Sequence, residues 1–251
     1  MSDVSAGKAD PARAKRLADS LAWAGDGAAH LRGLMTRMGG DAFGAPSLLP
    51  GWSRAHVLTH IARGADSMIN LLTWARTGVR TAAYESVDQR DADIEAGATR
   101  PPAAVCDDVI TSSDRLAQAV RVMPAEAWAA TVENLRGREF PAVEIPWIRA
   151  KETWIHSVDL DVGASFSDFP APMLAALLND ASRVIAGRPG CPSVRLIATD
   201  RPMEWVVGDP DVAQPVRGPA AELTAWLLGR SRGKALSTTA GSKLPSVPRW
   251  L

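Results

Sequence analysis

Apolar residues recur at steps of three and four positions in four long segments within the first two thirds of the chain. Such spacing places the apolar side chains along one face of a helix. Glycine or proline lies at the boundaries of several segments, as it often does at helix ends. The pattern therefore predicts four long helices, over residues 11–38, 53–77, 101–122 and 144–161.

The connections between these segments differ in length. Residues 79–100 are polar and mixed, with room for one short helix near 88–97, and residues 123–143 predict a long connection with two short extended pieces. This order of elements predicts a four-helix bundle with at least one long crossover. The cores of such bundles commonly hold metal sites built from facing helices.

The pattern changes in the stretch GASFSDFP at residues 163–170, which has no helical periodicity and marks a domain boundary. A helix over 172–186 is predicted next, then three extended pieces, a helix over 219–229 and a short strand near 235–239. The extended pieces cover 193–200, 202–209 and 212–218. The fold class is therefore mainly α with a second α+β domain that contains a small, mostly antiparallel sheet. We expect the bundle to span 1–165 and the α+β domain to span 166–251.

Composition and charge narrow the possible partners and the compartment. The 28 basic and 28 acidic residues cancel, so net charge gives no argument for nucleic acid or an acidic membrane as a partner. No apolar run approaches the roughly 20 residues of a membrane span. The first fifteen residues lack the apolar core of a signal peptide and are expected to form a short disordered leader. Cys106 and Cys191 are isolated, which favours a reducing cytoplasm.

Two polar residues interrupt the buried face of the helix predicted over 144–161. Glu152 precedes His156 by four positions, so both side chains lie on one face, about one turn apart. Burying an unpaired carboxylate is costly, so a compensating positive charge is required. A cation bound by both residues is one solution. A buried pair of Glu152 with His156, Arg149 or Lys151 is the alternative.

A third metal ligand would have to come from another histidine, and the chain offers His30, His56 and His60. His60 lies on the apolar face of its predicted helix. A single histidine in that setting is more often a core residue than a metal ligand. Together with Glu152 and His156 it supplies two imidazoles and one carboxylate, the donor set of catalytic zinc sites with an open position. Non-haem Fe(II) sites use the same donor types, so the donors alone leave the metal open.

Several stretches resemble one known family. They are LPGWSRAHVLTHIARGADSMINLL (49–72), RDADIEAGATRP (90–101), RAKETWIHSVDLD (149–161), VRGPAAELTAWLLGRSRG (216–233) and LPSVPRWL (244–251). They are similar to the mycothiol-dependent maleylpyruvate isomerase family, which belongs to the DinB-like metal-binding bundles. The resemblance extends over nearly the whole chain.

The resemblance implies a Zn²⁺ site at His60, Glu152 and His156, with mycothiol as the thiol cofactor. It implies that Arg230 faces a cleft between the domains, where it would bind a substrate carboxylate or enolate. Arg90 lies in a shared stretch and receives a catalytic role from the resemblance alone, because its own surroundings favour a solvated connector. The implied reaction is the cis–trans isomerisation of maleylpyruvate to fumarylpyruvate, by thiolate addition, bond rotation and elimination.

Other functions stay open from the sequence. The same site suits a metal-dependent S-transferase that uses mycothiol, ergothioneine or another small thiol. A non-catalytic metal-binding regulatory protein, like the zinc-dependent anti-sigma factors, is a further alternative, although those proteins use cysteine ligands that this site lacks. For the isomerase we expect a small dicarboxylate substrate and a small thiol as partners, no nucleic acid or membrane, and a monomer or weak homodimer.

Overall fold

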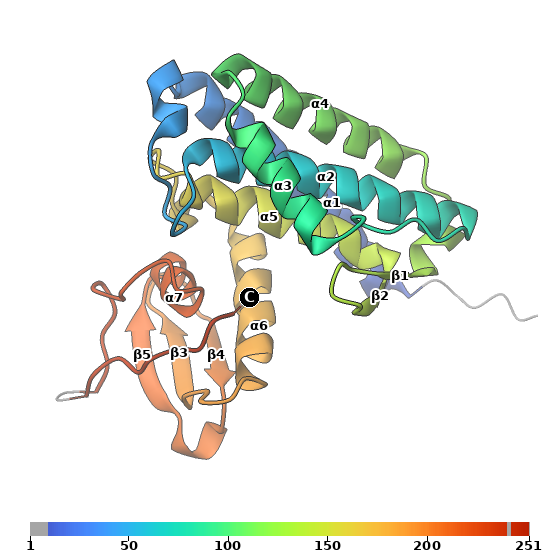
Figure 1. Ribbon diagram of the computed structural model, residues 1–251. Coiled ribbons are helices and arrows are strands. Elements are labelled where there is room, and N and C mark those ends of the chain that lie inside the picture. The colour runs from blue at the N-terminus through green and yellow to red at the C-terminus, as the bar shows by residue number, and fades with distance from the viewer. Residues whose placement is uncertain (1–9, 240–241, 251) are drawn as a thin grey trace, which may run out of the picture. The chain divides into compact units, whose positions relative to one another are not determined.

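The computed structural model describes residues 10–239 and 242–250 (Figure 1). The expected disordered leader falls largely on residues 1–9, outside the described residues. The chain divides into two compact units, Met1–Val162 and Gly163–Leu251. Within the described part of the chain, no helix is long and apolar enough to cross a membrane.

Long helices dominate the first unit, as the periodicity predicts. They are α1 (Pro11–Arg37), α2 (Arg54–Thr77), α4 (Pro102–Arg121) and α5 (Ile145–Asp159), with the shorter α3 (Val87–Ala98) between α2 and α4 in sequence. Helix α1 packs on α5, and α2 packs on α3, α4 and α5. The predicted fold class is confirmed. Helix α2 is central to the bundle, because three of the other four helices pack on it.

The ends of α2 follow from its sequence. The Ser53 hydroxyl accepts a hydrogen bond from the His56 backbone N–H, and the His56 ring accepts one from the Ser53 N–H, so two otherwise unpaired donors are satisfied. Gly78 ends the helix in the left-handed conformation, with φ of 73°, which glycine adopts without steric cost. Both boundaries agree with the predicted helix.

The core of the first unit lies around the buried face of α2. Val57, Leu58, Ile61 and Ala62 have no solvent exposure. They belong to a cluster that includes Leu31 from α1, Val105 and Val109 from α4, and Leu160 at the end of α5. Burial of this apolar surface is the main stabilising contribution to such a bundle, and it fixes which face of α2 points inward.

Helix α3 lies alongside α2, as Figure 1 shows in green and cyan. The two backbones approach closely where Gly97 faces Thr59, because a Cβ atom at residue 97 would overlap the Thr59 side chain. A glycine at this position therefore allows α3 to pack directly on α2. The connection from α4 to α5 holds the two predicted extended pieces, which form the antiparallel strands β1 (Thr131–Glu133) and β2 (Glu139–Pro141).

The second unit combines a three-stranded sheet with two helices. Its elements are α6 (Ala171–Ala186), β3 (Val194–Ala198), β4 (Glu204–Val207), β5 (Gln214–Gly218) and α7 (Ala220–Leu227). Helix α6 packs on α7 and on β4, and α7 packs on β3 and β5. The predicted α+β character is confirmed.

The strand order is β4-β3-β5, so β3 is central. Strand β4 pairs with it antiparallel, with Leu196 opposite Trp205, whereas β5 pairs with it parallel, with Leu196 opposite Val216. The sheet is therefore mixed, whereas the sequence predicts mostly antiparallel pairing. The chain reverses twice between β3 and β5 and reaches the opposite edge of β3, which makes that pair parallel. The short strand expected near 235–239 is one antiparallel bridge, between Arg217 and Ser237.

Candidate metal centre

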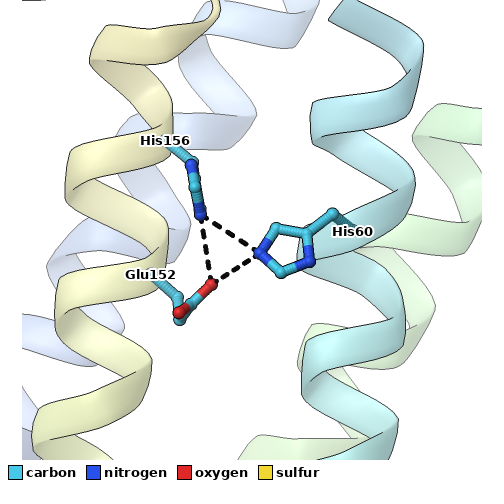
Figure 2. Close-up of side chains that lie close together, drawn as sticks. All are labelled: His60, Glu152 and His156. Carbon is cyan, nitrogen blue, oxygen red and sulfur yellow. Dashed lines mark hydrogen bonds and ion pairs between the residues drawn. The ribbon is translucent and has the colours of Figure 1, made fainter. Parts of the chain in front are cut away.

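Three of the predicted site residues meet between α2 and α5 (Figure 2). His60 Nε2 lies 2.9 Å from Glu152 Oε2 and 3.1 Å from His156 Nε2. The distance between Glu152 Oε2 and His156 Nε2 is 3.3 Å. Figure 2 shows the three side chains pointing toward one another, with His60 from α2 and the other two from α5. The helical faces inferred from the sequence thus bring these residues together.

The donor atoms are arranged as a small cation requires. An ion bound tetrahedrally at zinc's distances to nitrogen and oxygen holds its ligand atoms about 3.3 Å from one another. The three observed separations, 2.9, 3.1 and 3.3 Å, are close to this value. Three protein ligands leave at least one position open, which is the pattern of catalytic sites. The residues therefore fit a divalent metal ion, and their role as ligands stays a prediction.

A buried carboxylate orients His156. The Nδ1 atom of His156 lies 2.9 Å from Oδ2 of Asp159, whose side chain has no solvent exposure. This contact fixes the ring so that Nε2 points toward Glu152 and His60, and such partners raise the basicity of a metal-binding histidine. Asp159 is not among the site residues predicted from the sequence. Its spacing of three residues from His156 on one helix is the feature that could have identified it.

Arg90 contacts the other side of the site. Its Nη2 atom lies 3.2 Å from His60 Nδ1, and its Nη1 atom pairs with Asp91 at 2.5 Å. A guanidinium group only donates, so His60 Nδ1 accepts here and its Nε2 carries the ring proton. Binding of a cation by Nε2 would require that proton to move to Nδ1, and Arg90 would then have to leave this contact. Because α3 packs on α2, the idea of a solvated connector around Arg90 is wrong.

The protonation states of the three residues follow from burial and mutual contacts. Burial alone would raise the pKa of Glu152, but hydrogen bonds from His156 and His60 hold this pKa well below its ordinary value. Burial would lower the pKa of His156, but Asp159 and Glu152 outweigh it and raise the pKa to about 9. The pKa of His60 is lowered, because burial outweighs the hydrogen bond to Glu152. The metal-free site therefore contains a carboxylate, an imidazolium and a neutral imidazole.

Comparison with known proteins identifies the family. The family model described as the mycothiol maleylpyruvate isomerase N-terminal domain matches residues 24–161, more than half of the chain. The chain belongs to this family.

Two solved structures of this family resemble nearly the whole chain. They are crystal structures of the mycothiol-dependent maleylpyruvate isomerase and of a histidine-to-alanine mutant, with TM-scores of 0.83 and 0.84. Each has 30% sequence identity to this family member. In both comparisons the matched region covers 93% of this chain and 97% of the chain in the crystal structure. Among curated protein sequences, none matches significantly. The resemblance seen in the sequence is confirmed.

A buried arginine links the helices that carry the candidate ligands of this isomerase-family protein. Arg149 lies on α5, three residues before Glu152, and is only 4% exposed. Its Nη1 donates to the carbonyl oxygen of Ile61 at 2.8 Å, next to His60 on α2, and its Nη2 donates to Ser113 Oγ on α4. Burial lowers its pKa to about 10, so it stays charged at neutral pH. The compensating contacts of Glu152 itself come from the two histidines.

The remaining histidines have structural partners. His30 stacks on Trp154 with ring centroids 4.8 Å apart. His56 caps α2, and its Nε2 lies 3.2 Å from Glu95 Oε2. In residues 10–239 and 242–250, only His60, Glu152 and His156 form a cluster of three potential metal ligands. The choice of His60 over His30 and His56 therefore agrees with the geometry.

Arg230 lies in the second unit, directly after α7. Its Nη1 donates to the carbonyl oxygen of Leu228 at 2.9 Å, and its backbone N–H donates to Ala225, which closes the turn at the end of the helix. The side chain is half-buried. Its role in substrate binding stays a prediction.

Proposed function

We propose that this family member catalyses the cis–trans isomerisation of maleylpyruvate to fumarylpyruvate, with mycothiol as the thiol and a metal ion held by His60, Glu152 and His156. The observation that carries the proposal is the convergence of these three donor atoms within 4.8 Å of one another in a member of the isomerase family. The expected metal is Zn²⁺, because two nitrogen donors and one oxygen donor with an open position suit a catalytic zinc ion.

A cation at this site would favour the thiolate form of a thiol in its open position, and the thiolate is the nucleophilic form. A thiolate held there would supply reversible addition to the cis double bond of maleylpyruvate, with the electron pair of that bond carried by the adjacent dicarbonyl group as an enolate. Rotation about the resulting single bond and elimination of the thiolate would give the trans isomer, so no net proton or electron would be consumed.

The protein's own residues have separate tasks in this scheme. Asp159 holds the His156 ring in its orientation, and Arg149 keeps α5 beside the His60 segment. Arg90 supplies positive charge next to His60 and would stabilise the enolate as it forms. Arg230 would bind a substrate carboxylate, for which the two parallel N–H groups of a guanidinium are well suited.

The test combines metal analysis with an activity assay. Protein loaded with zinc and supplied with mycothiol should change the ultraviolet absorbance of maleylpyruvate, and the product should be fumarylpyruvate. Glu152→Ala and His156→Ala should lose both the metal and the activity. His30→Ala, which removes a histidine stacked on Trp154 rather than a ligand, should keep both.

Three outcomes would count against the proposal. Absence of isomerisation by the metal-loaded protein would refute the reaction. A stable thiol–substrate adduct in mass spectrometry would assign an S-transferase instead. Full activity in Glu152→Ala or His156→Ala would refute the metal site.

A further inference from the structure

A polar cavity of about 360 Å³ lies in the first unit, between α2, the segment that precedes α3, and α3 itself. Arg63, Ser67 and Asn70 line it from α2, and Gln89 and Asp93 line it from α3. This volume is within the range of small-molecule sites, about 300–1,000 Å³. None of the metal-centre residues lines the cavity, so it is a separate feature of the same domain.

The cavity continues the face of α2 that carries His60. Residues 60, 63, 67 and 70 follow one another at steps of three and four, so they share one side of the helix. Gly64, one turn beyond His60, borders open space, because a Cβ atom there would meet no atom within 4 Å. Space therefore remains beside α2 at this residue, which lies between His60 and Ser67 on the helix.

Tyr84 lies between the cavity lining and Arg90. Its side chain lines the cavity, and burial raises its pKa, partly offset by Ser67 and by the charge of Arg90. Arg90 in turn contacts His60 Nδ1 at 3.2 Å. The electrostatic effect of Glu152 also reaches Tyr84 and contributes to the raised pKa. Tyr84 is therefore a neighbour both of Ser67 in the cavity lining and of Arg90, which contacts His60.

The lining has the chemistry of a site for hydroxyl groups. Ser67 and Tyr84 contribute hydroxyls, Asn70 and Gln89 contribute amides, and Asp93 contributes a carboxylate. Amides and hydroxyls both donate and accept hydrogen bonds, and carboxylates accept them from hydroxyl donors. Such a mixed lining matches a molecule with many hydroxyl groups.

The charges of the lining argue against an anionic ligand. Arg63 is the cation among the lining residues, and it is already paired with Asp66 at 3.0 Å and with Asp108 at 2.6 Å. The carboxylates of Asp66, Glu85 and Asp93 outnumber it. A dicarboxylate substrate would meet net repulsion here, whereas an uncharged ligand would not.

We propose that this cavity binds the uncharged, polyhydroxylated part of the thiol cofactor, while the sulfur end lies at the metal centre. Mycothiol has this form, with an acetylated cysteine at one end and two linked polyhydroxylated rings at the other. The inference rests on the proposed function in one respect, namely that a small thiol is the cofactor. It assigns the recognition of that thiol to α2 and α3.

The test compares two thiols that share the sulfur end. Isothermal titration of metal-loaded protein with mycothiol and with N-acetylcysteine, which lacks the rings, measures the contribution of the cavity. The wild-type protein should bind mycothiol more tightly. In the double variant Gln89→Ala with Asp93→Ala, the Kd for mycothiol should rise about tenfold and the Kd for N-acetylcysteine should stay unchanged. Gln89 and Asp93 are both exposed and hydrogen-bond each other at 2.8 Å, so they are removed together.

Asp88→Ala is the matched control, because Asp88 is exposed on the same helix, lies outside the cavity and carries the same charge as Asp93. It should leave both dissociation constants unchanged. Equal affinity of the wild-type protein for the two thiols, or equal effects of the double variant on both, would overturn the inference. Because no maleylpyruvate is present, failure of the isomerase activity is a separate result. A protein that isomerises maleylpyruvate but binds both thiols alike would disprove the cavity's role alone.

Discussion

The α5 side and the α3 side of the candidate metal centre hold their polar groups in different ways. On α5, His156 is fixed by the fully buried Asp159, and the buried Arg149 ties the helix to the backbone beside His60. On α3, Arg90 keeps about a quarter of its side chain exposed, at 23%, and the neighbouring cavity is lined by partly exposed polar groups. The first arrangement suits a permanently bound metal ion. The second suits molecules that bind and dissociate during turnover. The following experiments measure this difference.

The largest expected effect is on the α5 side. Asp159→Asn removes the negative charge that orients His156 and raises its basicity, so the affinity for zinc should fall about 10- to 100-fold. Competition with a chromophoric chelator measures it, and circular dichroism verifies the fold. Asp161→Asn, two residues further on and exposed, should leave zinc affinity unchanged. Equal zinc affinity in the wild-type protein and Asp159→Asn would mean that the buried contact does not support the ligand.

The pH dependence of metal binding tests the same side with a smaller effect. Zinc needs the free Nε2 of His156, whose pKa is raised to about 9 in the metal-free site. The pKa of His60 and that of Glu152 are both lowered, so neither competes for a proton above neutral pH. Zinc affinity should therefore fall about tenfold for each pH unit from about 9 down to 7, as one proton must leave. A flat profile in this range would contradict the charged state of His156.

The smallest expected effect on metal binding is on the α3 side. Arg90→Ala removes a positive charge and a donor that occupies His60 Nδ1, so zinc affinity should stay constant or rise by a few-fold. Turnover with mycothiol should fall by about 100-fold if Arg90 stabilises the enolate. Arg100→Ala is the control, because Arg100 follows α3 and pairs with Asp108 away from the site. Loss of zinc in Arg90→Ala would instead mean that Arg90 supports metal binding, as Asp159 is expected to do on α5.

The helices and the three converging residues could be predicted because their evidence is local. The periodicity of α2 and α5 indicates which faces point inward. His60, Glu152 and His156 are partly buried on the sides by which these two helices face each other (Figure 2). Arg149 could not be recognised as a buried link from its sequence position, because its partners, Ile61 and Ser113, lie on other helices. A charged residue next to a buried stripe is usually solvated, and only the packing shows that this one is not.

Elements that depend on partners distant in the chain were harder to predict. The alternation of apolar residues in β5 indicates a strand, but it does not indicate which edge of β3 that strand joins or in which direction. The polar composition of residues 79–100 concealed the packing of α3 on α2 for the same reason. Arg90 received its role from the family resemblance, and its contact with His60 depends on that packing.

The close approach at Gly97 gives a way to compare relatives by sequence. Because a Cβ atom at this position would overlap Thr59, a family member with a larger residue there must either shorten the facing side chain or move α3 outward. An outward shift would widen the cavity and draw the counterpart of Arg90 away from the counterpart of His60. Covariation of this pair of positions among homologues would then separate subgroups that differ in the size of the thiol they accept.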